Sequence, residues 1–435
     1  MEKREKLHNK VKSTGLIREI VKDFYGSVIG APQEGRKVCW CVGAGPYELL
    51  KAMDIGHFQT ENWGVAVTSR KSERLMIEEA SREGYSSDIC SYASINIGYA
   101  LLMQKGKVPD DLSPELRVPK PDFLFCINTC PSMAQWTEAL REIFDVPAFI
   151  MDVPLFYDDH DEVQYQRNIL YAVEQLQDAV VFIEEITGQP YHWDRLKEIL
   201  TYIKKTSIVR KELFELWCHK PSSISYWDMA IALGVANVFR GTPEALTFFT
   251  KIRDEVAERI KRGITSVPKE KHRLLWYMNH PWFKVGHLSE FFARLDTVVV
   301  GGQYVIGPYA DPEKIDPGRP LWTIAEEHPT RPYVRTMRFK IETFIKALAR
   351  AFQVDGIVFH APRTCRPNSW DHFDEGEIVK HEMGLPYIII EADHSDPQFY
   401  SEVEVDNRLQ AFIETLPKNK QGEAPSENQP SIEER

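Results

Sequence analysis

The stretch DFLFCINTCPSMAQWTEALREIF, residues 122–144, joins a strand-like run to a helix-like run through a short loop that holds Cys130. Residues 122–128 are mostly apolar, as in a strand buried on both faces of a parallel sheet. From Met133 onward the apolar residues recur at helical spacing. The order strand, loop, helix predicts a βα unit with Cys130 where the strand gives way to the helix.

The same order of features recurs near the C-terminus. DFLFCINTC, a helix and DVPAFIMDVP are matched by DGIVFHAPRTC, a helix and GLPYIIIEAD. Cys130 precedes Pro147 by 17 residues and Cys365 precedes Pro386 by 21, so the two helices differ by about one turn. Each cysteine is expected at the carboxyl end of a parallel strand, which is the edge where open α/β sheets bind ligands.

Strand-like runs alternate with helical segments on both sides of a long helical stretch. This pattern predicts an α/β fold with two tandem doubly wound parallel-sheet domains, Rossmann or flavodoxin-like, joined by a helical connector. The strand-like runs are KVCWCVGA, GVAVTS, DFLFCIN, PAFIMDV, HRLLWYMN, DTVVVGGQY, DGIVFH and PYIIIEAD. The expected divisions are an N-terminal helix at 1–30, a first α/β domain at 31–162, a connector at 163–264, a second α/β domain at 265–416 and a disordered polar tail at 417–435.

The composition limits the classes of function. A chain of 435 residues with 43% hydrophobic residues is long enough for two or three domains. The formal charge of −11 disfavours broad contact with nucleic-acid phosphates. The charged start MEKREKLHNK lacks the apolar stretch of a signal peptide, and no run approaches the roughly 20 apolar residues of a membrane span. We therefore expect a cytoplasmic protein with no nucleic-acid or membrane partner.

The seven cysteines are scattered and odd in number, which argues against a disulfide framework or a zinc ribbon. Cys90, Cys130 and Cys365 lie in loops at expected helix starts, where backbone N–H groups and the helix dipole favour negative charge. Three converging thiolates suit an iron–sulfur cluster, one thiol beside a histidine suits nucleophilic catalysis, and packing alone is a third interpretation. The spacing leaves all three open. Packing roles are expected for Cys39, Cys41, Cys126 and Cys218.

A third helix start is expected at Cys90. In the run REGYSSDICSYASINIGYALL, Ser86, Ser87 or Asp88 is expected to cap a helix that places Cys90 in its first turn.

These residues resemble the family of benzoyl-CoA reductase and 2-hydroxyacyl-CoA dehydratase subunits, from about residue 37 to residue 416. The resemblance implies two tandem α/β domains in which Cys90, Cys130 and Cys365 bind one [4Fe–4S] cluster. It is carried by PYELL at 46–50, SSDICSYASINIG around Cys90, INTCPSMAQWTEALREIF with DVPAFIMDVP around Cys130, and DGIVFHAPRTC to IEADHSDPQFYSEVEVDNRLQAFIE around Cys365.

Within this family the chain is more similar to the reductase subunits. Dehydratase subunits often follow the second cysteine with an acidic residue, a small residue and two lysines, whereas residues 131–136 here are PSMAQW. The resemblance implies a subunit of an ATP-dependent, iron–sulfur benzoyl-CoA (aryl-CoA) reductase, which dearomatises the ring by single low-potential electron transfers. A 2-hydroxyacyl-CoA dehydratase subunit working through a ketyl radical is the alternative. A non-catalytic scaffold and a metal-free CoA-binding protein are further ones.

The chain has no G-x-x-x-x-G-K-[ST] phosphate loop, so ATP hydrolysis is expected in another protein. The resemblance implies an acyl-CoA substrate, a homologous second catalytic subunit, and a dimeric ATP-hydrolysing iron–sulfur activator fed by ferredoxin. His360 is the candidate catalytic residue, and Trp136, Arg363 and Glu61 are candidates for substrate binding. For each of the four, packing or a place in an ordinary loop is the competing interpretation.

Overall fold

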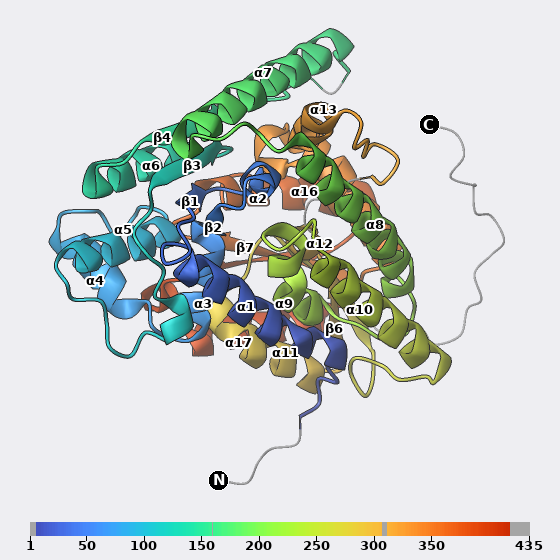
Figure 1. Cartoon of the computed structure of the whole chain (residues 1–435). Coiled ribbons are helices and arrows are strands. Elements are labelled where there is room, and N and C mark those ends of the chain that lie inside the picture. The colour runs from blue at the N-terminus through green and yellow to red at the C-terminus, as the bar shows by residue number, and fades with distance from the viewer. Residues whose placement is uncertain (1–5, 159, 307–310, 418–435) are drawn as a thin grey trace.

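The structure, a computed structural model, describes residues 6–158, 160–306 and 311–417. Two four-stranded sheets, all parallel, are flanked by helices (Figure 1). The α/β fold with two tandem sheets is therefore confirmed. All but the first residue of the expected tail, 417–435, lies outside the described residues.

The first sheet has the strand order β2-β1-β3-β4. Its strands are β1 (Val38–Val42), β2 (Gly56–Gln59), β3 (Phe123–Asn128) and β4 (Ala148–Asp152). The helices between them are α2 (Tyr47–Ala52), α3 (Thr60–Ser69), α4 (Arg74–Arg82), α5 (Ser91–Gln104) and α6 (Pro131–Phe144).

The second sheet repeats this plan with the order β6-β5-β7-β8. Its strands are β5 (His272–Tyr277), β6 (Thr297–Gly301), β7 (Gly356–Pro362) and β8 (Tyr387–Ala392). Its helices are α11 (Val285–Arg294), α12 (Gln303–Ile306), α13 (Pro320–Ala325), α14 (Met337–Lys340), α15 (Ala347–Phe352), α16 (His372–Met383) and α17 (Glu402–Thr415), and a π-helical stretch, Ile341–Lys346, joins α14 to α15. The duplicated unit expected from the sequence is present as β3–α6–β4 and β7–α16–β8.

Residues 163–261 form four helices separated by turns. The connector comprises α7 (Glu162–Thr187), α8 (Trp193–Trp217), α9 (Tyr226–Asn237) and α10 (Pro243–Lys261). Local signals set the boundaries: Asp161 caps α7, Gly188 ends it with φ at 66°, and a capping box formed by Ser225 and Asp228 begins α9. The N-terminal segment forms a 3-10 turn (Lys12–Leu16) and α1 (Ile17–Gly30), which packs beside α9 (Figure 1).

One expected strand is wrong. GVAVTS, residues 64–69, belongs to α3, and the strand that pairs with β1 is GHFQ, residues 56–59. GHFQ is a short strand at the edge of the sheet, and it has a single large apolar residue, Phe58, so it lacks the apolar run that identifies a buried strand. Valine disfavours helices only weakly, so the burial of Val67 in the core outweighs its preference for strands and the segment forms a helix.

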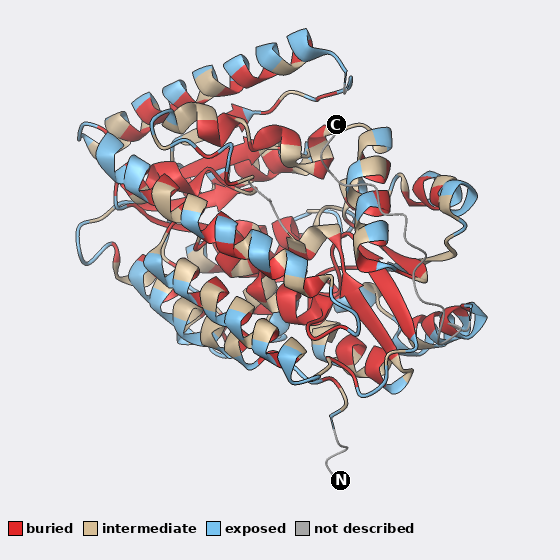
Figure 2. Cartoon of the chain, turned by 90° about the vertical axis from the view of Figure 1, so that its right-hand side faces the viewer, coloured by how far each residue is buried: buried red, intermediate tan, exposed pale blue. Residues whose placement is uncertain are grey.

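The core is continuous across both sheets. Alternate residues of β1 and β3 face opposite sides: Trp40 and Leu124 join a cluster that runs through α9 and α10 to the second sheet, whereas Cys39 and Phe125 pack against α2, α7 and α8. Figure 2 shows the strands as buried and the helices exposed along their outer faces. No helix within the described ranges combines the length and apolar character needed to cross a membrane.

A buried ion-pair group ties three parts of the chain together. Arg240, between α9 and α10, bonds Glu48 of α2, and its two terminal nitrogens donate to the Glu327 carboxylate at 2.7 Å each.

Replacing Arg240 by leucine is expected to lower the free energy of unfolding by about 3–5 kcal/mol, because two buried carboxylates lose their cation. Urea unfolding measures this loss. Arg74→Ala, which breaks an exposed pair with Glu78, is the control and should leave stability almost unchanged; equal stability of the two variants would contradict the prediction.

Candidate active site

The three loop cysteines each occupy a helix N-cap. Cys90 begins α5, Cys130 begins α6, and Cys365 begins the 3-10 turn Arg366–Asn368 that leads to α16. Cys130 and Cys365 follow β3 and β7, as the duplicated pattern predicted. Backbone N–H groups of the following turns lie near the sulfurs and oppose the rise in their pKa, from residues 92 and 93 for Cys90, from 132 and 133 for Cys130, and from 368 for Cys365.

The expected cap of α5 is wrong by two or more residues. Cys90 itself is the N-cap, and Ser91 is the first helical residue. The hydroxyl of Ser86 instead accepts from the backbone N–H of Asp88, closing a separate turn before the helix. The cysteine therefore sits at the helix entrance rather than inside its first turn.

The three thiols are close enough to interact electrostatically. Burial raises the pKa of all three, that of Cys130 to about 11, and the neighbouring thiols Cys90 and Cys130 raise the pKa of Cys365 further. Without a metal such thiols stay protonated at neutral pH, which does not suit a free nucleophile. A bound metal ion would remove these protons by its own charge.

The spacing of the sulfurs bears on what they can hold. Among the described residues, the only group of three or more potential ligands with all ligand atoms within 4.8 Å of one another is His287, Glu402 and Asp406. At least one pair of the three sulfurs is therefore more than 4.8 Å apart, whereas a single tetrahedral ion would bring each pair to about 3.8 Å. Three thiols at helix starts with wider spacing fit a multi-iron cluster better than a single ion.

A cavity of about 1090 Å³ lies beside this cysteine group. Thr129 and Met133, which flank Cys130, contribute to its wall, as does Tyr92, two residues after Cys90. Segments from α1, α3 and α9 and residues 114–115, 282–286, 303–304 and 330–333 also contribute to the wall. This volume is large enough for an organic ligand. The cavity adjoins the cysteine loops at the carboxyl edge of the first sheet, where α/β proteins bind ligands.

Glu61, one of the candidate substrate-binding residues, lies in the wall of this cavity. Gln59 Nε2 donates to its Oε2 at 2.7 Å. Burial raises the pKa of Glu61 to about 7, although the bond from Gln59 and the charge of Arg331 oppose the shift. The carboxyl group is therefore partly protonated near neutral pH and can either accept or donate a proton.

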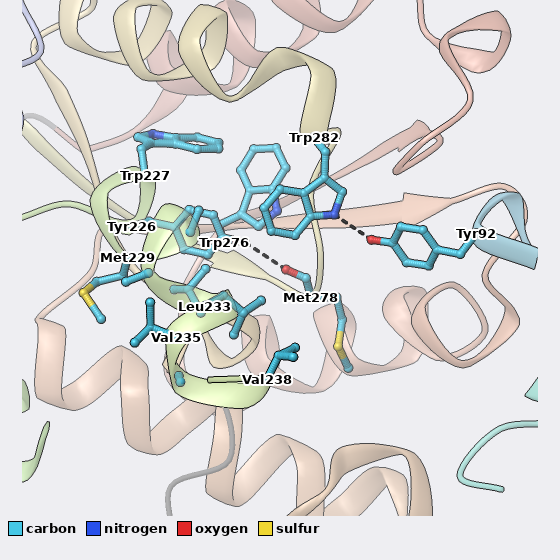
Figure 3. Packing of buried hydrophobic residues seen from close by; sticks show 14 of the residues in the cluster. Tyr92, Tyr226, Trp227, Met229, Leu233, Val235, Val238, Trp276, Met278 and Trp282 are labelled. Atoms are coloured by element: carbon cyan, nitrogen blue, oxygen red, sulfur yellow. Dashed lines mark hydrogen bonds between the residues drawn. The ribbon is translucent and has the colours of Figure 1, made fainter. Parts of the chain in front are cut away.

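Tyrosines form the other polar part of the cavity wall. Trp282 Nε1 donates to the hydroxyl of Tyr92 at 2.6 Å, and Figure 3 shows the two side chains pointing toward each other from the two halves of the chain. Tyr304 lies near Tyr92 and lines the cavity with Tyr333. Burial raises the pKa of all three phenols, so they remain proton donors.

The other three candidate residues lie away from the cavity wall. His360 is fully buried, with Nδ1 at 2.9 Å from the carbonyl oxygen of Asn279, and burial lowers its pKa to about 3. Arg363 is exposed, pairs with Asp88 at 3.5 Å and stacks on a phenyl ring. Trp136 packs in the core with only 3% of its surface exposed. None of the three is among the residues that line the cavity.

Two cavity residues had no role in the sequence interpretation. Tyr92 stands inside the SDICSYAS motif but was not distinguished from its neighbours. Tyr304 follows β6 within the run DTVVVGGQY, so it lies just beyond the carboxyl end of a parallel strand. The rule that ligands bind at that edge would have selected Tyr304.

Comparison with known proteins gives matches over nearly the whole chain. The family described as 2-hydroxyglutaryl-CoA dehydratase, D-component, matches residues 41–416. Lactoyl-CoA dehydratase subunit alpha of Anaerotignum propionicum is 29% identical, covering 89% of this chain and 93% of the relative. The (R)-phenyllactyl-CoA dehydratase alpha subunit of Clostridium sporogenes is 28% identical over 97% and 100%. A benzoyl-CoA reductase subunit of Thauera aromatica is 26% identical over 95% and 96%, so identity alone does not separate the two activities.

Proposed function

Because the chain belongs to the 2-hydroxyglutaryl-CoA dehydratase D-component family, we propose that it is a catalytic subunit of an iron–sulfur enzyme acting on an acyl-CoA thioester. Cys90, Cys130 and Cys365 would hold a [4Fe–4S] cluster, which supplies single low-potential electrons when bound. The observation that carries this proposal is the convergence of three helix-capping thiols beside one large cavity that contains a titrating carboxyl group.

Dehydration of a 2-hydroxyacyl-CoA is the reaction that the relatives favour, since lactoyl-CoA, phenyllactyl-CoA, hydroxyisocaproyl-CoA and hydroxyglutaryl-CoA dehydratase subunits are all similar to this chain. In that reaction the hydroxyl at carbon two leaves and a proton is lost from carbon three. Because Glu61, Tyr92 and Tyr304 line the cavity, we infer that Glu61 accepts that proton and that the two phenols donate hydrogen bonds to an oxygen of the substrate. The buried apolar part of the wall would limit the access of water to the reacting substrate.

Reduction of an aryl-CoA is the second candidate, and a specific feature favours it. The similarity to the benzoyl-CoA reductase chain of Thauera aromatica covers 95% of this protein, and residues 131–136, PSMAQW, lack the acidic and lysine residues typical of dehydratase subunits. The same cavity would then hold an aromatic ring, and Glu61 would donate rather than accept a proton.

The partners follow from the same family. Several relatives are named as alpha subunits, which implies a hetero-oligomer, so we propose a homologous second subunit. An ATP-hydrolysing iron–sulfur activator fed by ferredoxin would provide the electrons.

The decisive experiment compares the two substrate classes directly. The chain is co-expressed with its partner subunit, purified without oxygen, and assayed with activator and ATP on a 2-hydroxyacyl-CoA and on benzoyl-CoA. Loss of water from the first substrate supports the dehydratase, and formation of a cyclic dienoyl-CoA from the second supports the reductase. An iron-free chain that is inactive on both would contradict the proposal.

The pH dependence of turnover should report Glu61. If its carboxylate accepts the proton, kcat/KM rises with pH and levels off above about pH 7. Glu61→Gln is expected to lower kcat/KM by about 10²–10⁴-fold and to remove this limb of the profile. Glu115→Gln, which lies in the wall of the same cavity, is the control and should keep the wild-type profile. An unchanged limb in Glu61→Gln would assign the titration to another group.

The pH dependence of folding stability gives an independent measurement of the pKa of Glu61. The pKa of Glu61 is about 4.3 in the unfolded chain and about 7 in the folded one. As the pH rises through this range, the carboxyl group ionises more readily in the unfolded chain, so the free energy of unfolding falls. Glu61→Gln is therefore expected to gain stability relative to wild type at pH 8 but not at pH 4. Thermal unfolding at both pH values tests this sign.

Two exposed, positively charged side chains lie where α1 lines the cavity. Arg18 and Lys22 are one helical turn apart and extend this wall toward solvent. We propose that these two side chains bind the phosphates of coenzyme A. Replacing both by glutamine is expected to raise KM for acyl-CoA about tenfold while leaving kcat nearly unchanged. The control Lys12→Gln removes a neighbouring cation that is not in the cavity wall, and an equal rise in KM there would indicate a nonspecific charge effect.

A further inference from the structure

A hydrogen-bond network links the loop of Cys90 to the loop of Cys365. The backbone N–H of Ser91 donates to Thr364 Oγ1 at 3.1 Å across a sequence separation of 273 residues. Thr364 Oγ1 donates in turn to Asp393 Oδ2 at 2.5 Å, and the Thr364 backbone N–H donates to the same oxygen at 3.1 Å. The residue directly after Cys90 is thus bonded to the residue directly before Cys365, and the Asp393 carboxylate holds Thr364 in place.

The network is closed by a second bridge between the halves. Ser91 Oγ lies 2.9 Å from His394 Nε2, and the rings of His394 and Tyr92 are 4.2 Å apart between centroids. Asp393 Oδ1 accepts from the backbone N–H groups of Ser395 and Asp396 at 2.9 Å each. Ser91, Thr364, Asp393 and His394, here called the interloop network, are each at most 3% exposed.

The position of these residues gives the network a specific consequence. Cys90 begins α5 of the first half, whereas Cys365 follows β7 of the second, so neither βα unit by itself fixes the distance between their sulfurs. The exposed pair Arg363–Asp88 also spans the two loops, but a solvated ion pair adds little. The buried hydrogen bonds that Thr364 accepts from Ser91 and donates to Asp393 restrict the two loops far more.

We propose that the interloop network is a positioning device that sets the separation of Cys90 and Cys365 before any cluster binds. This inference rests on the proposed cluster at the three cysteines. Its physical basis is preorganisation, since ligands already held at the required spacing lose less conformational freedom on binding. Thr364 is the central residue, because its hydroxyl accepts from one half and donates to the other.

The test removes that hydroxyl without changing the side-chain volume. In Thr364→Val, hydrogen exchange at the Ser91 amide, measured by mass spectrometry on the metal-free full-length chain, is expected to accelerate at least about tenfold. The apparent affinity for iron and sulfide, measured from their content per chain during anaerobic reconstitution with the partner subunit, should fall by at least about tenfold. The electron paramagnetic resonance spectrum of the cluster should also change. Thr364→Ser keeps a hydroxyl and should restore all three readouts.

A matched control separates positioning from general stability. Asp228→Asn alters an equally buried carboxylate, in the capping box of α9, and should lower the unfolding temperature while leaving iron content and spectrum as in wild type. Wild-type iron content and spectrum in Thr364→Val would overturn the inference, and so would equal iron loss in both variants. Absence of iron from the wild type would instead refute the proposed function, while the Ser91 exchange rate still reports whether the network holds the loops.

Discussion

Cys90→Ser, Cys130→Ser and Cys365→Ser are each expected to lower iron from about four per chain to below one and to reduce turnover to below about 1% of wild type. Each variant removes one of the three proposed thiol ligands, and no other described cysteine can substitute, because the remaining ones lie in strands or at the end of α8. Iron and acid-labile sulfide assays on anaerobically purified protein measure the first effect, and the acyl-CoA assay measures the second.

The control for this prediction is Cys218→Ser. Cys218 is partly exposed like the three candidate ligands, but it caps the C-terminus of α8. Full iron content is expected in this variant. Retention of about four irons in any of the three ligand variants would remove that cysteine from the cluster.

Gly98→Ala is expected to lower the free energy of unfolding by about 3 kcal/mol. Gly98 lies on α5 where that helix crosses α4, and an added Cβ would stand 1.8 Å from the carbonyl oxygen of Met76. A rigid helix backbone cannot yield as a side chain would, so the two helices must separate. Because α5 begins at Cys90, the variant should also bind less iron.

Urea unfolding of the metal-free chain measures the first effect of Gly98→Ala. Gly26→Ala is the control, since Gly26 is also helical and an added Cβ meets no atom within 4 Å. That variant should change stability by less than about 1 kcal/mol. Equal stability of the two variants would show that α4 and α5 can separate at little cost.

The fold was predictable because its strongest signals are local and repeated. The two Cys-containing βα units could be recognised from apolar runs, helical spacing and the shared order of cysteine and proline. GVAVTS was misassigned because a helix that packs valine in the core carries the same short apolar run as a strand, and periodicity over six residues cannot distinguish them. Packing against β1 decides that segment, and packing is not local.

The site was predictable only in part. Residues at the carboxyl ends of strands could be selected, and Glu61 indeed lines the cavity. His360 also stands near a strand end, yet its ring turns toward Asn279 in the interior. Sequence position gives the edge of a sheet but not the direction in which a terminal side chain points. Tyr92 and Trp282 come together from segments 190 residues apart, and no local pattern encodes that contact.

The continuous core limits how such a chain can change over time. The cluster that begins on one face of the first sheet passes through α9 and α10 and ends on the second sheet, so neither half encloses a complete apolar interior. A half exchanged with that of a distant relative would bring mismatched side chains to this shared interior, at a cost comparable to a poorly packed core. The two halves are therefore expected to be inherited together and to accumulate compensating substitutions, rather than to shuffle as independent modules.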